Sequence, residues 1–294
     1  MLWKIRRKTW ANKMVAKKAE KVSEYTRRKM SLAIVDVAWS NILCRDVSDD
    51  ERKLLESPPK KQKVLETGPE GEPFTFLATA QRDGSVILWE MKTPVTNESD
   101  VSIATEIETD YHWPTALCWL HHNQGKVHSK DFLAIGSLTG ELGLWQIMYK
   151  EHQTAAAVRV CDLWTEKDDM RIDYICWIPC ETDPSYWYLL TMKAQHIILF
   201  LLSIPTLEEE LASPVVLSSC VQNSLHTVPS SGLYSCPSFA ISCSQDGSLQ
   251  KVQPCYANNE LSVKVDLFEK HPPIGPAHRG CTMTASGVYL STLT

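Results

Sequence analysis

One fifteen-residue pattern, called a phrase here, occurs twice in the sequence. FLATAQRDGSVILWE begins at Phe76, and FLAIGSLTGELGLWQ begins at Phe132, 56 residues later. Both phrases have Phe-Leu-Ala at the front, a glycine in the middle and Leu-Trp near the end. Each has an apolar run rich in strand-forming residues, a short polar segment with glycine, and a second apolar run. Glycine supplies the positive φ that a tight turn needs, so each phrase predicts a β-hairpin.

Further copies follow along the chain. A third hairpin pattern begins at Tyr188, 56 residues after the second, without glycine or tryptophan. A fourth begins at Phe239, and its Asp246-Gly247-Ser248 repeats Asp83-Gly84-Ser85 of the first. A half-copy covers residues 281–290.

A second motif precedes the hairpins and sits inside short apolar runs. Its three occurrences are Val37-Ala38-Trp39, Leu117-Cys118-Trp119 and Ile175-Cys176-Trp177. Each unit therefore has an inner strand, a hairpin and a more variable outer strand, such as residues 101–103 or 158–160. Four strands per repeated unit predict an all-β fold, a β-propeller over residues 31–294 with about four and a half blades. A β-sandwich or another all-β domain is the alternative, because Asp-Gly hairpins are common in all-β proteins.

The repeated phrases resemble the WD-repeat family, with three departures. The usual Gly-His pair is missing, the usual Trp-Asp is Trp89-Glu90 or Trp145-Gln146, and the period exceeds the usual 40–45 or so residues. Four and a half blades are fewer than is common in that family, and ring closure protects the edges of the sheets. We therefore expect a fragment, an isoform or a partial gene product whose full-length form continues.

More narrowly, the chain is similar to the N-terminal propeller of the ninety-kilodalton subunits of transcription factor IIIC. The matching stretches are FLATAQRDGSVILWEM, PTALCWL with FLAIGSLTGELGLWQI, and GCTMTASGVYLSTLT. The resemblance covers residues 31–294. It implies a nuclear scaffold in the complex that recruits RNA polymerase III to transfer-RNA genes. The partners would be other subunits of that complex, with DNA contacted through the complex. A WD-repeat adaptor outside transcription is the alternative.

The same resemblance implies an association with histone acetyltransferase activity and a C-terminal zinc-binding region, but no residues here match either. Asp110, His112, Asp183 and His196 could each supply a base, yet nothing in their spacing places them together. Cys176 and Cys180 find no second pair at zinc-ligand spacing. We therefore predict no catalytic, cofactor-binding or metal-binding residues, and a histone acetyltransferase remains a second hypothesis carried by the resemblance alone.

The first thirty residues have a charge opposite to the rest. Residues 1–30 hold eleven Lys and Arg against two Glu, a net of +9, which leaves −14 for the remainder. They lack Gly and Pro and have apolar residues at loosely helical spacing, which predicts a short basic amphipathic helix. A linker helix docked by its apolar side is favoured over an arm for phosphate backbones. A mitochondrial transit peptide is the third option, although Lys outnumbers Arg and Ser is scarce.

Residues 45–73 interrupt the repeat. They are charged, contain Pro and Gly, and predict a disordered insertion within the propeller. Lys60, Lys61 and Lys63 follow two prolines there and resemble a nuclear import signal, with an ordinary solvated charge cluster as the equal alternative. No secretory signal is visible, and cysteines in predicted strands fit a reducing compartment. The predicted localisation is therefore the nucleus.

Overall fold

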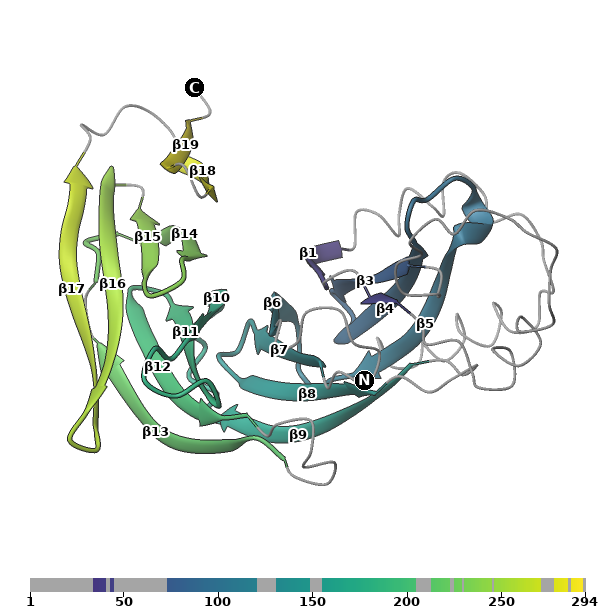
Figure 1. Cartoon of the computed structure of the whole chain (residues 1–294), viewed down its shortest axis with the longest axis horizontal. Coiled ribbons are helices and arrows are strands. Elements are labelled where there is room, and N and C mark those ends of the chain that lie inside the picture. Colours follow the sequence, from purple (N-terminus) through teal and green to yellow (C-terminus); the bar gives the residue numbers. More distant parts are fainter. Residues whose placement is uncertain are drawn as a thin grey trace, which may run out of the picture. The chain divides into compact units, whose positions relative to one another are not determined.

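The computed structural model describes residues 34–40, 43–44, 73–120, 131–148, 155–204, 213–222, 225–228, 230–244, 246–270, 278–284 and 287–292. Apart from the short 3-10 helix η1 (Glu98–Asp100), the regular elements in these ranges are β-strands (Figure 1). None of the helical structure described there is long and apolar enough to cross a membrane. The predicted N-terminal helix over residues 1–30 and residues 45–72 of the predicted insertion lie outside the described residues.

Four blades follow one another along the chain, and their strands pair in the order named here. Blade 1 contains β1 (Ile34–Trp39), β3 (Pro73–Gln81), β4 (Ser85–Lys92) and β5 (Val101–Glu108), with the short β2 (Leu43–Cys44) beside β3. Blade 2 contains β6 (Pro114–Leu120), β7 (Asp131–Ser137), β8 (Leu142–Met148) and β9 (Ala156–Trp164). Blade 3 contains β10 (Ile172–Pro179), β11 (Tyr186–Lys193), β12 (His196–Ser203) and β13 (Val215–Gln222). Blade 4 contains β14 (Ser230–Ser235), β15 (Ala240–Ser244), β16 (Ser248–Ala257) and β17 (Glu260–Lys270).

A two-stranded sheet of β18 (His278–Thr284) and β19 (Gly287–Thr292) follows blade 4. It corresponds to the predicted half-copy. The described sheets do not close into a ring, so they form an incomplete β-propeller (Figure 1). The predicted fold class is confirmed, and each tryptophan motif lies on the first strand of its blade, hereafter the inner strand.

The repeated phrases form the predicted hairpins. In the first, Ala80 pairs with Val86 across a turn in which Gly84 has φ 93°. Asp83 stabilises this turn, because its Oδ1 accepts hydrogen bonds from the backbone N (3.0 Å) and Oγ (2.6 Å) of Ser85. The third hairpin makes its turn without glycine: Lys193 pairs with His196, and Ala194 adopts φ 55°.

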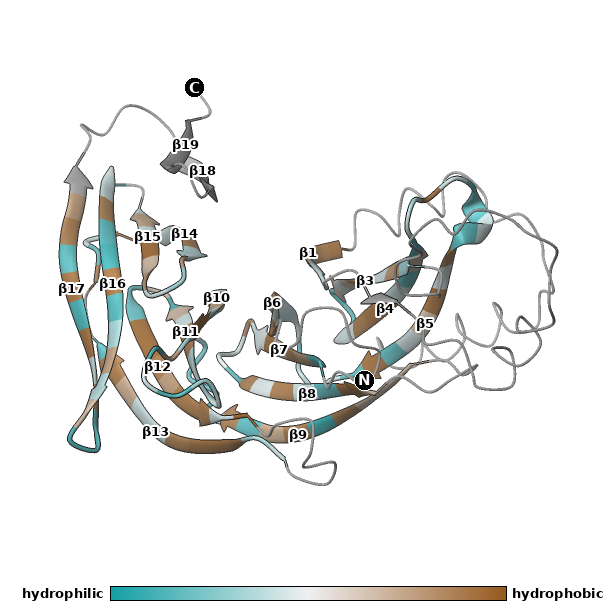
Figure 2. Cartoon of the chain, in the orientation of Figure 1, coloured by the Kyte–Doolittle hydropathy of each residue, from teal (hydrophilic) through white to brown (hydrophobic). Residues whose placement is uncertain are grey.

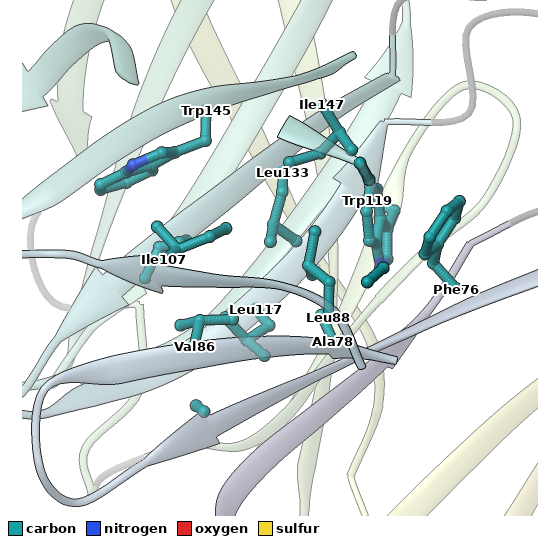
Figure 3. Packing of buried hydrophobic residues seen from close by; sticks show 14 of the residues in the cluster. Phe76, Ala78, Val86, Leu88, Ile107, Leu117, Trp119, Leu133, Trp145 and Ile147 are labelled. Atoms are coloured by element: carbon teal, nitrogen blue, oxygen red, sulfur yellow. The ribbon is translucent and has the colours of Figure 1, made fainter. Parts of the chain in front are cut away.

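Neighbouring blades are held together by apolar side chains. The first cluster joins blades 1 and 2, and Figure 3 shows Trp119 and Leu133 of blade 2 facing Leu88 of blade 1. A second cluster joins blades 2 and 3, and a third joins blades 3 and 4. Blade 3 lies between two clusters, which explains why β12 is hydrophobic along most of its length (Figure 2). Each large apolar side chain buried there contributes roughly 1.5–3 kcal/mol, more than the roughly 1 kcal/mol net of a hydrogen bond.

Candidate interaction surface

The four side chains considered as possible bases lie on three different connections. Asp110 and His112 are exposed on the connection between β5 and β6. Asp183 lies on the connection between β10 and β11, and His196 begins β12. The carboxylate of Asp183 is hydrogen-bonded within its own turn, since its Oδ1 accepts from the backbone N (2.8 Å) and Oγ (2.6 Å) of Ser185. These hydrogen bonds lower the pKa of Asp183.

Asp183 and His196 lie at opposite ends of one hairpin. Lys193 pairs with His196 at the turn end, and Tyr186 pairs with Ser203 at the other end. Asp183 precedes Tyr186, so a strand of about 25 Å separates it from His196. Asp183 and His196 therefore lie too far apart to act on one substrate atom.

The cysteines considered for metal binding are engaged in packing. Cys176 and Cys180 are both buried, and the Sγ of Cys180 lies 3.1 Å from Oγ1 of Thr182 and 3.4 Å from the hydroxyl of Tyr188. Across the described ranges, no group of three or more His, Cys, Asp or Glu side chains is placed to hold a metal ion.

The hairpin turns and the connections between blades form one edge of each blade, which we call the turn edge. In blade 1, Thr109 on the outgoing connection donates to the carbonyl of Gly84 through its backbone N (3.3 Å) and its Oγ1 (2.6 Å). In blade 3, the backbone N of Leu225 donates to the carbonyl of Gln195 (3.0 Å). The connection that leaves each of these blades is thus bound to the hairpin turn of the same blade.

In blade 2, the connection and the hairpin turn are joined by Lys193, a residue of blade 3. Its side chain is buried, and its Nζ donates to the carbonyl of Gly140 (3.1 Å) and lies 2.8 Å from Oδ2 of Asp168. The same Nζ lies 4.9 Å from the centre of the Trp164 ring. Gly140 has φ 96°, a conformation that residues with a Cβ rarely adopt, and a Cβ there would lie 2.5 Å from Oδ1 of Asp168, so any other residue would strain this turn.

His226 binds the connection that enters blade 4 to the hairpin of that blade. It is buried, with Nδ1 2.9 Å from Oγ of Ser248 and Nε2 2.8 Å from Oγ of Ser242. The hydroxyl of Ser248 donates to Asp246, so it accepts from Nδ1–H of His226, and Nε2 accepts from Ser242. Burial lowers the pKa of His226, which favours the neutral ring.

Asp246 completes this network. Burial raises the pKa of its carboxyl, but hydrogen bonds from Ser248 and Thr227 oppose burial and hold the pKa below its ordinary value. The Gly-His pair usual in WD repeats is absent from the sequence, and His226 follows Leu225 rather than glycine. The signal that could have found it is a histidine ahead of an inner strand whose hairpin has the Asp246-Gly247-Ser248 turn.

The exposed part of the turn edge is suited to contacts with another protein. The guanidinium of Arg82, in the turn between β3 and β4, lies 5.2 Å from the centre of the Trp113 ring. His112, the neighbour of Trp113 on the connection between β5 and β6, lies beside that ring. Arg82 and His112 are exposed, and Trp113 is half-buried. Arginine and tryptophan are enriched at protein interfaces, where a flat ring and a planar cation offer contact area at low entropic cost.

The inner strands make the third set of contacts between blades. The indole Nε1 of Trp119 in β6 donates to the carbonyl of Ala38 in β1 (3.1 Å). The indole Nε1 of Trp177 in β10 donates to the carbonyl of Cys118 in β6 (3.4 Å). Each tryptophan thus reaches the inner strand of the preceding blade.

Comparison with known proteins supports this description of the fold. The family model of the transcription factor IIIC subunit delta β-propeller domain matches residues 5–263 of the chain. No curated protein sequence matches it.

Three solved structures are similar to parts of the chain at low sequence identity. Sqt1 of Chaetomium thermophilum, bound to the N-terminus of the ribosomal protein L10, is 16% identical with a TM-score of 0.37, over 60% of this chain and 42% of that one. A chain of the polycomb repressive complex 2 of Chaetomium thermophilum is 12% identical with a TM-score of 0.41, over 82% of this chain and 40% of that one. The designed protein Ika8 is 9% identical with a TM-score of 0.24, over 73% and 89%. The chain spans about two fifths of the length of the first two structures.

Proposed function

Because the chain belongs to the family of transcription factor IIIC subunit delta β-propeller domains, we propose that it is a non-catalytic scaffold in a transcription factor IIIC complex. In this role it holds other subunits together in the nucleus, and the complex recruits RNA polymerase III to transfer-RNA genes. The single observation that carries the proposal is the family match over residues 5–263.

The use of polar side chains in the propeller supports a scaffold over an enzyme. Acetyl transfer needs a base for the lysine amine and donors for the thioester oxygen in one place. Lys193, Asp168 and His226 are instead bonded to the turns of the blades. A propeller with its polar groups used in this way offers its turn edge and inner strands as contact surfaces for other proteins.

Affinity capture tests the proposal. We expect the tagged 294-residue chain, expressed in cells, to capture subunits of transcription factor IIIC. The DNA recovered with this complex should be enriched in transfer-RNA genes. Calorimetry with acetyl-coenzyme A should show no binding, and histone peptides should gain no acetyl groups. Capture of proteins without any transcription subunit would support an adaptor outside transcription, and saturable binding of the cofactor would support the acetyltransferase.

Lys60, Lys61 and Lys63 are proposed to direct nuclear import, and they lie outside the described residues. A fluorescent reporter fused to residues 45–73 should accumulate in the nucleus, and changing the three lysines to alanine should disperse it. The same triple change is also made in the full chain, where the matched control changes Lys13, Lys17 and Lys18 to alanine and so removes the same charge from the N-terminal segment. If the unaltered peptide never concentrates in the nucleus, the three lysines are an ordinary solvated cluster.

A further inference from the structure

The last strand of each blade is its outer strand, and in blade 3 this strand is β13 (Figure 1). β13 pairs with β12 from Val215 to Gln222, and none of the other described strands pairs with it. In such an edge strand, about half of the backbone N–H and C=O groups point away from the sheet. They form a row of donors and acceptors that matches the backbone of another extended chain.

The open edge of β13 does not depend on how many blades the propeller has. Blade 3 has a neighbour on both sides, because the second cluster joins it to blade 2 and the third cluster joins it to blade 4. Cys220 of β13 is half-buried against the third cluster. A blade added at either end of the described series would therefore leave the edge of β13 open.

The charge of β13 differs from that of the other outer strands. Its sequence, VVLSSCVQ, contains no charged residue. β5 contains Glu106 and Glu108, β9 contains Arg159 and Asp162, and β17 contains charged residues along its whole length. Charged side chains protect edge strands against pairing with a further strand. Among the four outer strands, β13 is the one that lacks this protection.

The exposed side chains of β13 are mostly apolar, and Figure 2 colours much of the strand as hydrophobic. The large apolar side chains exposed there are Val215, Val216, Leu217 and Val221. The register with β12 shifts once, beside Leu217, and is regular over residues 218–222. Val221 lies in this regular part and is 48% exposed. An open edge with apolar side chains is the kind of strand to which another strand adds.

The charge near β13 indicates what an added strand carries. Residues 194–250 contain no Lys or Arg, and Glu208-Glu209-Glu210 form an acidic run within them. The run lies outside the described residues, but in sequence it stands between Ser203 and Val215, which pair with each other at one end of β13. A complementary strand is therefore apolar and has Lys or Arg beyond the end that meets Val215. A second copy of β13 offers no such charge, since its flanking residues lack both.

We propose that the edge of β13 binds an extended segment of another subunit, which is added to blade 3 as a further strand. Backbone hydrogen bonds hold the segment, its apolar side chains pack beside Val221, and its basic end meets the acidic run. This inference rests on the proposed scaffold function and names one contact through which a partner subunit is held.

Photo-cross-linking tests the location of the contact. The photoreactive residue p-benzoyl-phenylalanine replaces Val221 in the full chain in cells, and the captured complex is irradiated and mapped by mass spectrometry. The expected product joins position 221 to an apolar segment of another subunit with Lys or Arg beyond one end. The control replaces Val158, which is 46% exposed on β9 beside Arg159, and should give no product with that segment. A product within this chain, a product with a second copy, or no product at position 221 would overturn the proposal.

A charge placed on the edge tests strand addition. Val221→Lys should weaken capture of the cross-linked subunit by about tenfold, as expected when a buried valine contact is lost. Val158→Lys is the matched control and should leave capture unchanged. The melting temperature of the isolated chain should change by less than about 2 °C in both variants, because both side chains are exposed.

Removal of the acidic run tests the charge of the partner. Changing Glu208, Glu209 and Glu210 to glutamine should weaken capture of the same subunit by about fivefold, the sum of three modest exposed pairs. The control changes Glu66, Glu70 and Glu72 to glutamine, which removes the same charge elsewhere and should have no effect. Equal capture by the two triple variants would contradict a basic end on the bound segment.

The outcomes separate this inference from the proposed function. If the chain captures transcription factor IIIC subunits and Val221→Lys captures them equally well, the scaffold function stands and the edge of β13 is not the docking surface. If the unaltered chain captures no such subunit, the proposed function fails, and this inference fails with it.

Discussion

Replacing Lys193 with methionine is expected to lower the free energy of unfolding by about 3 kcal/mol. Methionine keeps the length and apolar stem of the side chain but removes its charge. Asp168, which is 26% exposed, then loses its counter-ion, and the carbonyl of Gly140 loses its donor. Breaking a fully buried ion pair costs roughly 3–5 kcal/mol, and the partial exposure of Asp168 places this pair at the lower end. Urea unfolding followed by circular dichroism measures the change.

Lys167 provides a matched control for this substitution. It is the neighbour of Asp168 in sequence and lies 3.2 Å from Oε1 of Glu141, but its side chain is 64% exposed. Solvent screens such a pair, so Lys167→Met should cost less than about 1 kcal/mol. If the two substitutions have equal effects, Lys193 does not hold blades 2 and 3 together in the way that its contacts indicate. Asp168→Asn combined with Lys193→Met should cost less than the sum of the single changes, because the two residues act as one pair.

Replacing His226 with alanine is expected to lower the free energy of unfolding by about 3 kcal/mol at pH 7.5. The substitution leaves a cavity and removes the ring partner of two hydroxyls, those of Ser242 and Ser248. Ser242 is completely buried, so water cannot easily replace the lost partner. Thermal unfolding at several pH values measures the change.

The effect of His226→Ala should shrink as the pH falls. Burial holds the pKa of His226 in the folded chain below its ordinary value of 6.5, so the unfolded chain binds the proton first. The stabilisation by neutral His226 is therefore complete above about pH 6.5 and decreases as the pH falls below that value toward the lower pKa of the folded chain. Only the unaltered protein carries this pH dependence, so the difference between the two proteins should be smaller at pH 5.5 than at pH 7.5.

His112→Ala is the control for the histidine experiment. His112 is exposed on the connection between β5 and β6, so its replacement should have little effect at either pH. A constant difference between His226→Ala and the unaltered protein across this pH range would contradict the burial of a neutral ring.

Local sequence patterns were sufficient to predict the blades. Asp83-Gly84-Ser85 and the apolar runs beside it lie within one fifteen-residue phrase, and the structure pairs Ala80 with Val86 as expected. A tight turn and its two strands are determined by neighbouring residues, because glycine supplies the positive φ and alternation selects the buried face. The same reasoning placed the three tryptophan motifs on strands ahead of the first three hairpins.

The contacts between blades could not be predicted in this way. Lys193 lies 53 residues from Gly140, and nothing in the third hairpin phrase distinguishes a lysine that is buried from one at an ordinary exposed turn. His226 lies 16 residues from Ser242, in a pairing that only the packing of the connection against blade 4 creates. Such partners are chosen by the arrangement of the sheets, since each blade buries its apolar faces against its neighbours.

The sequence by itself determined the repeat, the hairpins and the small residues beside each inner tryptophan. The tertiary structure decided which of those tryptophans are buried. Val37-Ala38-Trp39 matches Leu117-Cys118-Trp119 in pattern, yet Trp39 is 52% exposed and Trp119 is 3% exposed. A strand's own residues specify its conformation and which side chains share a face, but burial requires a second surface, and only the neighbouring blade supplies it.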